Sequence, residues 1–159
     1  PHLTGLENMQ IIAKLKGVKE AEIEKALKTV RLYEQRDKKL AAYSLGMKQR
    51  LGIAMALLGN PKLLILDEPC SGLDVTSREY FLKVLEENSK NDNAIPFIYV
   101  THQIEEIMPS VTHVALLHDG KILAKGFKKD ILTDKLLSQM FGLDVKIVWE
   151  NERPWLIVR

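Results

Sequence analysis

Leu63-Leu64-Ile65-Leu66 is a run of four aliphatic residues that leads directly into two acids, Asp67-Glu68. A run this short, with Pro61-Lys62 before it, is typical of a β-strand that is buried on both faces of a parallel sheet. Residues 97–100 (Phe-Ile-Tyr-Val) have the same character, and the polar-apolar pattern over residues 76–89 predicts a helix between the two strands. This alternation of strand and helix predicts an α/β fold with a parallel sheet.

The segment before this first strand has a helical pattern. Apolar residues recur every three or four positions over residues 6–17 and 21–32, which predicts two helices before residue 40. Ser44 is a natural N-cap for a third helix, and Gly59 is placed to end it. Farther along the chain, Asp119-Gly120 stands between two aliphatic runs and predicts a β-hairpin.

Asp67 and Glu68 follow the first predicted strand at its carboxyl end, the edge where open α/β sheets bind ligands. Adjacent strand residues point to opposite faces, so we expect the two acids to have different roles. Asp67 would suit the ligand shell of a Mg²⁺ ion, and Glu68 could orient or deprotonate an attacking water. For an Asp-Glu pair taken alone, a strand end that simply turns polar is the better explanation.

Three further motifs are ambiguous when each is taken alone. Residues 43–47 (Tyr-Ser-Leu-Gly-Met) combine a hydroxyl, a small glycine and the amides of a helix N-terminus, which can bind an anion, although a plainly capped helix has the same residues. Residues 71–74 (Ser-Gly-Leu-Asp) could form only a turn. His102 follows the second strand and could be a core histidine.

Taken together, the order and spacing of these motifs resembles the ATP-binding cassette (ABC) ATPases. Ser-x-Gly-x-x-Gln-Arg at 44–50, the strand ending Asp-Glu-Pro, the Ser-Gly-Leu-Asp segment and the strand ending Thr-His correspond to that family's signature motif, Walker B strand, D-loop and H-loop. The resemblance extends from Leu3 to Ile122, about three-quarters of the chain. It implies a P-loop NTPase-like parallel sheet with a helical subdomain.

The resemblance also implies roles for individual residues, with ATP and Mg²⁺ as cofactors. Asp67 would support the metal, Glu68 would be the catalytic base and His102 would contact the γ-phosphate. The implied nucleotide-binding residues are Ser44, Leu45, Gly46, Met47 and Asp74, of which Ser44 and Gly46 would contact an ATP held by the opposite subunit. Such domains work as head-to-tail pairs, docked on transmembrane permease subunits at the cytoplasmic face of the cell membrane.

The sequence departs from the family in one major respect. The Walker A loop, Gly-x-x-x-x-Gly-Lys-Ser/Thr, is absent, since the single Gly-Lys pair, Gly120-Lys121, is followed by Ile122. The family's Q-loop glutamine is also absent, and the chain opens with Pro1-His2 rather than Met. We therefore expect a fragment that lacks the N-terminal part of the core and is inactive as an ATPase by itself. The signature variant at 43–47 resembles that of antibiotic and lantibiotic exporters, which favours export.

The composition of the chain argues against several classes of protein. Twenty-three basic and 21 acidic residues give a net charge of +2, so we expect no nucleic-acid partner. The single cysteine, Cys70, excludes an intramolecular disulfide and fits a reducing compartment. No apolar run approaches the roughly 20 residues that a membrane helix needs. The transported substrate is not evident from any of these features.

We expect three regions: a helical subdomain at 1–42, the C-terminal part of the ATPase core at 43–126, and a small α+β extension at 127–159. The leading hypothesis is the ATP-hydrolysing subunit of an ABC transporter. One alternative is a soluble ABC ATPase that acts on nucleic acid or the ribosome. Another is a degenerate cassette that supplies only Ser44 and Gly46 to a competent partner.

Overall fold

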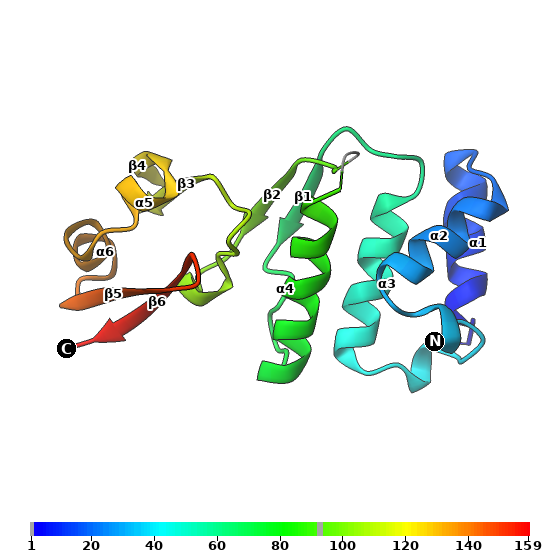
Figure 1. Ribbon diagram of the computed structural model, residues 1–159. Helices are drawn as coiled ribbons and strands as arrows, with labels where there is room; N and C mark the ends of the chain where they lie inside the picture. The colour runs from blue at the N-terminus through cyan, green and yellow to red at the C-terminus, as the bar shows by residue number, and fades with distance from the viewer. Residues whose placement is uncertain (1, 92–93) are drawn as a thin grey trace. The chain divides into compact units, whose positions relative to one another are not determined.

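The computed structural model describes residues 2–91 and 94–159 in two compact units, which divide between Val100 and Thr101. Pro1, the first residue of the expected helical subdomain, lies outside the described residues. Each unit contains both helices and strands, so the predicted α/β class is confirmed. Figure 1 labels the helices and strands of the two units.

The first unit opens with two helices, as predicted. α1 (Gly5–Lys16) begins with a capping box, in which the Glu7 amide donates to Thr4 Oγ1 at 3.1 Å and the Thr4 amide donates to Glu7 Oε2 at 2.6 Å. It ends where Gly17 takes the left-handed conformation with φ 65°. α2 (Glu20–Thr29) follows, and then come the short 3₁₀ turns η1 (Tyr33–Gln35) and η2 (Leu40–Ala42).

Two longer helices complete the helical layer. α3 (Leu45–Leu57) starts at Ser44, the predicted N-cap, and the chain leaves it through Gly59 with φ 80°. α4 (Val75–Ser89) starts at Asp74, which is also an N-cap. The largest side chains that these helices bury completely belong to Met9, Leu27, Leu51, Phe81 and Val84. The core of the first unit is therefore formed mainly between helices.

The two predicted strands pair in parallel. β1 (Leu64–Asp67) and β2 (Phe97–Val100) run in register from Leu64 opposite Phe97 to Asp67 opposite Val100. In Figure 1 both strands lie beside α4. The expectation that both strands are buried on both faces is wrong, because residues alternate in each. In β1, Leu64 and Leu66 are each 8% exposed and Ile65 is 64% exposed, and in β2 the alternate residues Ile98 and Val100 are 50% and 45% exposed.

The second unit consists of two antiparallel hairpins and short helices. After η3 (Ile104–Glu106), β3 (His113–His118) pairs with β4 (Lys121–Phe127). The predicted turn at Asp119-Gly120 is confirmed, since both residues have positive φ (49° and 70°), as a two-residue hairpin turn of this kind requires.

The tail of the second unit folds against the first of these hairpins. α5 (Lys128–Ile131) and α6 (Asp134–Phe141) lead to β5 (Val145–Glu150), which pairs with β6 (Arg153–Val158). The buried core that joins these elements consists of Ile104, Leu116, Leu132, Leu137, Val145 and Ile147. Among the described residues, no helix is long and apolar enough to cross a membrane.

Candidate functional site

The first turn of α3 holds the predicted signature residues. Ser44 Oγ accepts a hydrogen bond from the Met47 amide at 3.2 Å, which fixes the start of the helix. The amides of Leu45 and Gly46 are the first two of the helix and have no carbonyl one turn earlier to which they could donate. Ser44 and Leu45 are exposed. This turn can therefore present a hydroxyl and backbone amides to an anion.

The segment Ser71–Asp74 packs directly against this turn. Gln49 Nε2 donates a 3.2 Å hydrogen bond to the carbonyl oxygen of Ser71. Gly46 is buried against α4: a Cβ placed on Gly46 would lie 3.1 Å from Ser77 Cβ. The structure thus brings the predicted signature and D-loop motifs together, although some 25 residues separate them along the chain.

Asp74 is held at the N-terminus of α4. Its Oδ1 accepts from the Ser77 amide at 2.9 Å and its Oδ2 accepts from the Ser77 hydroxyl at 2.7 Å. The backbone hydrogen bond from Ser77, followed by the side-chain one, lowers the pKa of Asp74 below its ordinary value. The carboxylate is therefore charged and its direction is set by α4.

Asp67 and Glu68 end β1 in different ways. Asp67 is the last residue of the strand and is exposed, on the same face as Ile65. Glu68 has φ 45°, in the left-handed region that costs a residue with a side chain about 1–2 kcal/mol. The Glu68 amide donates to the Val100 carbonyl at 3.0 Å, and the Glu68 carbonyl accepts from the Ser71 amide at 3.0 Å. A turn of the backbone, rather than strand alternation, therefore sets the direction of Glu68.

His102 belongs to the second unit and is exposed there, so the core-histidine alternative is wrong. The flanking residues are fixed by Thr101, whose hydroxyl donates to Glu106 Oε2 at 2.6 Å and accepts from the Gln103 amide at 3.0 Å. The residues that the structure brings into contact are those of the signature turn and of segment 71–77, while Asp67 and Glu68 lie in the same unit as these two segments.

Arg50, the last residue of the motif at 44–50, has a structural role in the first unit. Its Nη1 donates to the Val30 carbonyl at 3.1 Å and its Nε to the Gly46 carbonyl at 3.4 Å. Its guanidinium carbon lies 4.4 Å from the centroid of the Tyr80 ring, and that of Arg31 lies 5.4 Å away. Burial lowers the pKa of Arg50. Arg50 therefore joins α2, α3 and α4 behind the signature turn.

The residues present are compatible with ATP and Mg²⁺. The N-terminal turn of α3 supplies donors suited to phosphate oxygens, and the exposed Asp67 supplies a hard oxygen donor. No group of three His, Cys, Asp or Glu side chains in the described residues could enclose a metal ion. Mg²⁺ commonly keeps several waters and binds through one or two carboxylates together with phosphates.

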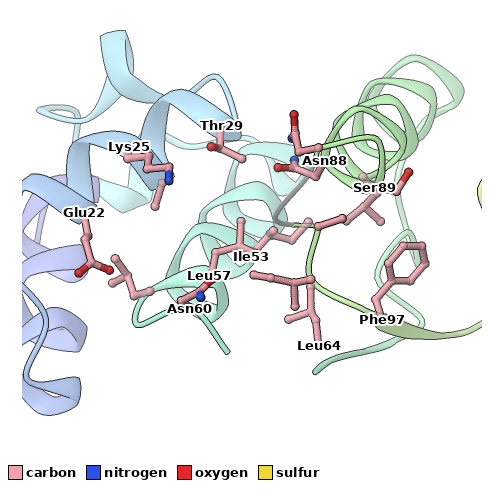
Figure 2. Close-up of a pocket in the computed structure, with 16 residues that line it drawn as sticks. Glu22, Lys25, Thr29, Ile53, Leu57, Asn60, Leu64, Asn88, Ser89 and Phe97 are labelled. Atoms are coloured by element: carbon pink, nitrogen blue, oxygen red, sulfur yellow. The ribbon is translucent and has the colours of Figure 1, made fainter. Parts of the chain in front are cut away.

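A cavity of about 740 Å³ lies elsewhere in the first unit. Figure 2 shows its lining, which comes from α2, the end of α3, the end of α4 and the starts of both strands. Labelled examples are Lys25, Leu57 and Asn88. None of the lining side chains belongs to a predicted site residue.

Residues 1–71 match the family described as "ABC transporter". The chain is 41% identical over 123 residues to an uncharacterized ABC transporter ATP-binding protein, YlmA, of Bacillus subtilis (strain 168), covering 77% of the chain and 47% of the relative. It is 42% identical over 126 residues to the bacitracin transport ATP-binding protein BcrA of Enterococcus faecalis, covering 77% of the chain and 40% of the relative. The chain thus spans less than half the length of these relatives.

Solved structures share the fold. The ADP conformation of MJ1267, an ATP-binding cassette of an ABC transporter, superposes with a TM-score of 0.73 at 23% identity, over 88% of this chain and 63% of that one. A metal-chelate type ABC transporter in an inward-facing conformation superposes with a TM-score of 0.83 at 21% identity, over 98% of this chain and 65% of that one. At this level of identity the likeness concerns the fold alone.

Proposed function

The chain belongs to the ABC transporter ATP-binding family, and from this premise we propose that it is part of an ATP-hydrolysing subunit that energises transport across a membrane. The observation that carries the proposal is the packing of the signature turn at Ser44–Met47 against segment Ser71–Asp74. In support of the proposal, Ser44 and Leu45 at the start of α3 are exposed, and so is Asp74 at the start of α4. Such a surface suits a nucleotide that is held by a second subunit.

The proposed roles follow from position and chemistry. Ser44 and Gly46 would bind the γ-phosphate of an ATP on the opposite subunit of a head-to-tail dimer, with Leu45 and Met47 shaping the turn. Asp74, charged and oriented by Ser77, would be the acid that faces that subunit. These residues act by positioning and electrostatic stabilisation, as phosphoryl transfer requires.

Glu68 is proposed as the catalytic base. Its left-handed backbone conformation supports this role, because strained residues that the fold maintains cluster at functional sites. Asp67 would hold Mg²⁺, which neutralises phosphate charge when bound. His102, exposed at the start of the second unit, would contact the γ-phosphate.

The proposed partners are transmembrane permease subunits and a second ATP-binding domain, at the cytoplasmic face of the membrane. Export is the proposed direction, supported by the Tyr43–Met47 variant and by the similarity to bacitracin transport proteins. Relatives named for spermidine and putrescine import, at 39% and 40% identity, make direction an experimental question. Residues 1–42, 43–126 and 127–159 remain the proposed functional regions.

The test is ATP hydrolysis by the transporter that contains this chain, purified with its permease in lipid vesicles. Glu68→Gln should lower the hydrolysis rate at least about 100-fold, the contribution of a positioned general base. Lys83→Gln, an exposed position on α4, should leave the rate unchanged. Equal rates in wild type and Glu68→Gln would contradict the proposal.

We further propose that the 159-residue chain alone does not hydrolyse ATP, because no Walker A loop is present in it to hold the phosphates. The isolated chain would refute this proposal if it hydrolysed ATP and lost that activity in the Glu68→Gln variant. Retention on nucleic acid that weakens steeply with salt would support the soluble-ATPase alternative instead. Wild-type hydrolysis that survives Glu68→Gln would support the degenerate-cassette alternative, in which only Ser44 and Gly46 contribute.

A further inference from the structure

In the side-chain amide of Gln49 the nitrogen is hydrogen-bonded but the buried oxygen is not. Its Nε2 donates to the Ser71 carbonyl at 3.2 Å, while its Oε1 is buried and has no hydrogen-bond partner among the described residues. An unsatisfied buried acceptor costs free energy that an apolar side chain of the same size would not cost. The amide is therefore poorly explained as a stabilising residue, and a buried polar atom of this kind calls for another role.

The hydrogen bond from Gln49 reaches the turn that follows β1. Within segment 68–74, the Ser71 amide donates to Glu68 and the Leu73 amide donates to Cys70. Gly72 has φ 74°, and a Cβ there would lie 3.3 Å from Leu45 Cδ2. Leu45 and Gln49 thus both lie against the same turn, Leu45 through a methyl group and Gln49 through its amide.

We propose that Gln49 is a positioning residue that ties segment Ser71–Asp74 to the first turn of α3, so that the anion site at Ser44 and Gly46 and the Asp74 carboxylate form one rigid surface. That this surface faces a nucleotide rests on the proposed function. That Gln49 ties the two segments together rests on the geometry alone. Gln49 does not contact nucleotide in this scheme and acts only through the loop.

The experiment compares three variants of the 159-residue chain by amide hydrogen exchange. Gln49→Met removes the donor and the unsatisfied acceptor at similar volume. Gln49→Lys restores a donor of sufficient length, and Lys48→Met places the same new side chain at the adjacent exposed position. We expect exchange at the Ser71 and Leu73 amides to rise about fivefold in Gln49→Met, the factor that corresponds to one net hydrogen bond.

The other readouts separate positioning from folding. In Gln49→Met the thermal midpoint should stay at or above that of wild type, because the unsatisfied Oε1 is gone. Gln49→Lys should return the exchange of both amides to the wild-type rate, and Lys48→Met should leave it unchanged. Unchanged exchange in Gln49→Met would overturn the proposal, and so would a general rise in exchange with a lower thermal midpoint.

The complete transporter provides the functional readout. Gln49→Met should lower kcat for ATP hydrolysis about fivefold without changing KM for ATP, and Gln49→Lys should restore kcat. A changed KM with unchanged kcat would overturn the positioning role. If the wild-type transporter hydrolyses no ATP, the proposed function fails, whereas the exchange result still decides whether Gln49 holds the loop.

Discussion

Ser77 binds Asp74 through two hydrogen bonds, one from its backbone amide at 2.9 Å and one from its hydroxyl at 2.7 Å. The same Ser77 side chain lies against Gly46 on α3. One serine therefore fixes the carboxylate that starts α4 and also limits the space beside the signature turn. Substitutions around it should show this double role.

The contact between Gly46 and Ser77 predicts opposite effects for two glycines of α3. A Cβ at Gly46 would meet Ser77 Cβ and Oγ at 3.1 and 3.2 Å, and Ser77 is held in place by Asp74. Gly46→Ala should therefore destabilise the first unit by about 1–3 kcal/mol. A Cβ at Gly52 has no heavy atom within 4 Å, so Gly52→Ala should stabilise it by about 0.5–1 kcal/mol.

Urea unfolding followed by far-UV circular dichroism measures this difference, because α1–α4 are the long helices of the first unit. Gly52→Ala is the matched control for helix propensity. Equal stability of the two alanine variants would show that Ser77 moves away from the new methyl group without cost.

The depressed pKa of Asp74 predicts a loss of stability in acid. Because its pKa is lower in the folded than in the unfolded chain, the stabilisation is present above the unfolded value of about 3.9 and is lost as the pH falls through the folded value. Asp74→Asn still caps α4 but does not titrate. The urea midpoint of this variant should fall less than that of wild type between about pH 5 and pH 2.

Glu7 is a second carboxylate whose pKa is lowered in the folded chain. Hydrogen bonds from the backbone and then the side chain of Thr4 lower its pKa in the same direction. Glu7→Gln should therefore remove a second part of the acid dependence, and the double variant with Asp74→Asn should remove more than either single one. Identical pH profiles for wild type and Asp74→Asn would contradict the assignment.

The positive φ of Glu68 predicts that glycine is preferred over alanine at this position. Both substitutions remove the side chain, so their difference isolates the backbone, and Glu68→Gly should be more stable than Glu68→Ala by about 1 kcal/mol. Lys83 is an exposed helical residue of α4, and there the glycine variant should be less stable than the alanine variant by about 1 kcal/mol. Urea unfolding of the four variants measures both differences, and the same order at both positions would refute the prediction.

Lys128 predicts a stability effect confined to the second unit. It is buried, and its Nζ donates to the carbonyls of Met108, Pro109 and Glu152 at 3.0, 3.0 and 3.2 Å. Lys128→Met removes these charge-assisted bonds and should cost about 2–4 kcal/mol. Lys129→Met, which removes an exposed ion pair, should cost little.

Tryptophan fluorescence measures this effect selectively, because both tryptophans, Trp149 and Trp155, lie in the second unit. The fluorescence midpoint should move in Lys128→Met while the helical circular dichroism of the first unit is preserved. A fluorescence midpoint equal to that of Lys129→Met would show that the carbonyls find other donors.

Local sequence was sufficient for the order and type of the four α-helices and two strands of the first unit and for the β3–β4 hairpin. The Ser44 cap, the aliphatic run before Asp67 and the turn at Asp119-Gly120 each act over a few residues, so their structural consequences could be predicted without knowledge of the rest of the chain. The family resemblance depends on the same local motifs and their spacing, and it was confirmed. The functional roles of the site residues remain predictions.

Only the tertiary structure decided which segments meet and which faces stay exposed. The Gln49 hydrogen bond to Ser71 and the stacking of Arg50 on Tyr80 join segments that are distant in sequence, so no local pattern specifies them. Glu68, with its left-handed backbone, donates a hydrogen bond to Val100 in the neighbouring strand, which is also distant in sequence. The burial of a strand also depends on tertiary structure. An aliphatic run indicates that a strand can be buried, but the elements that pack against it determine which of its faces is buried.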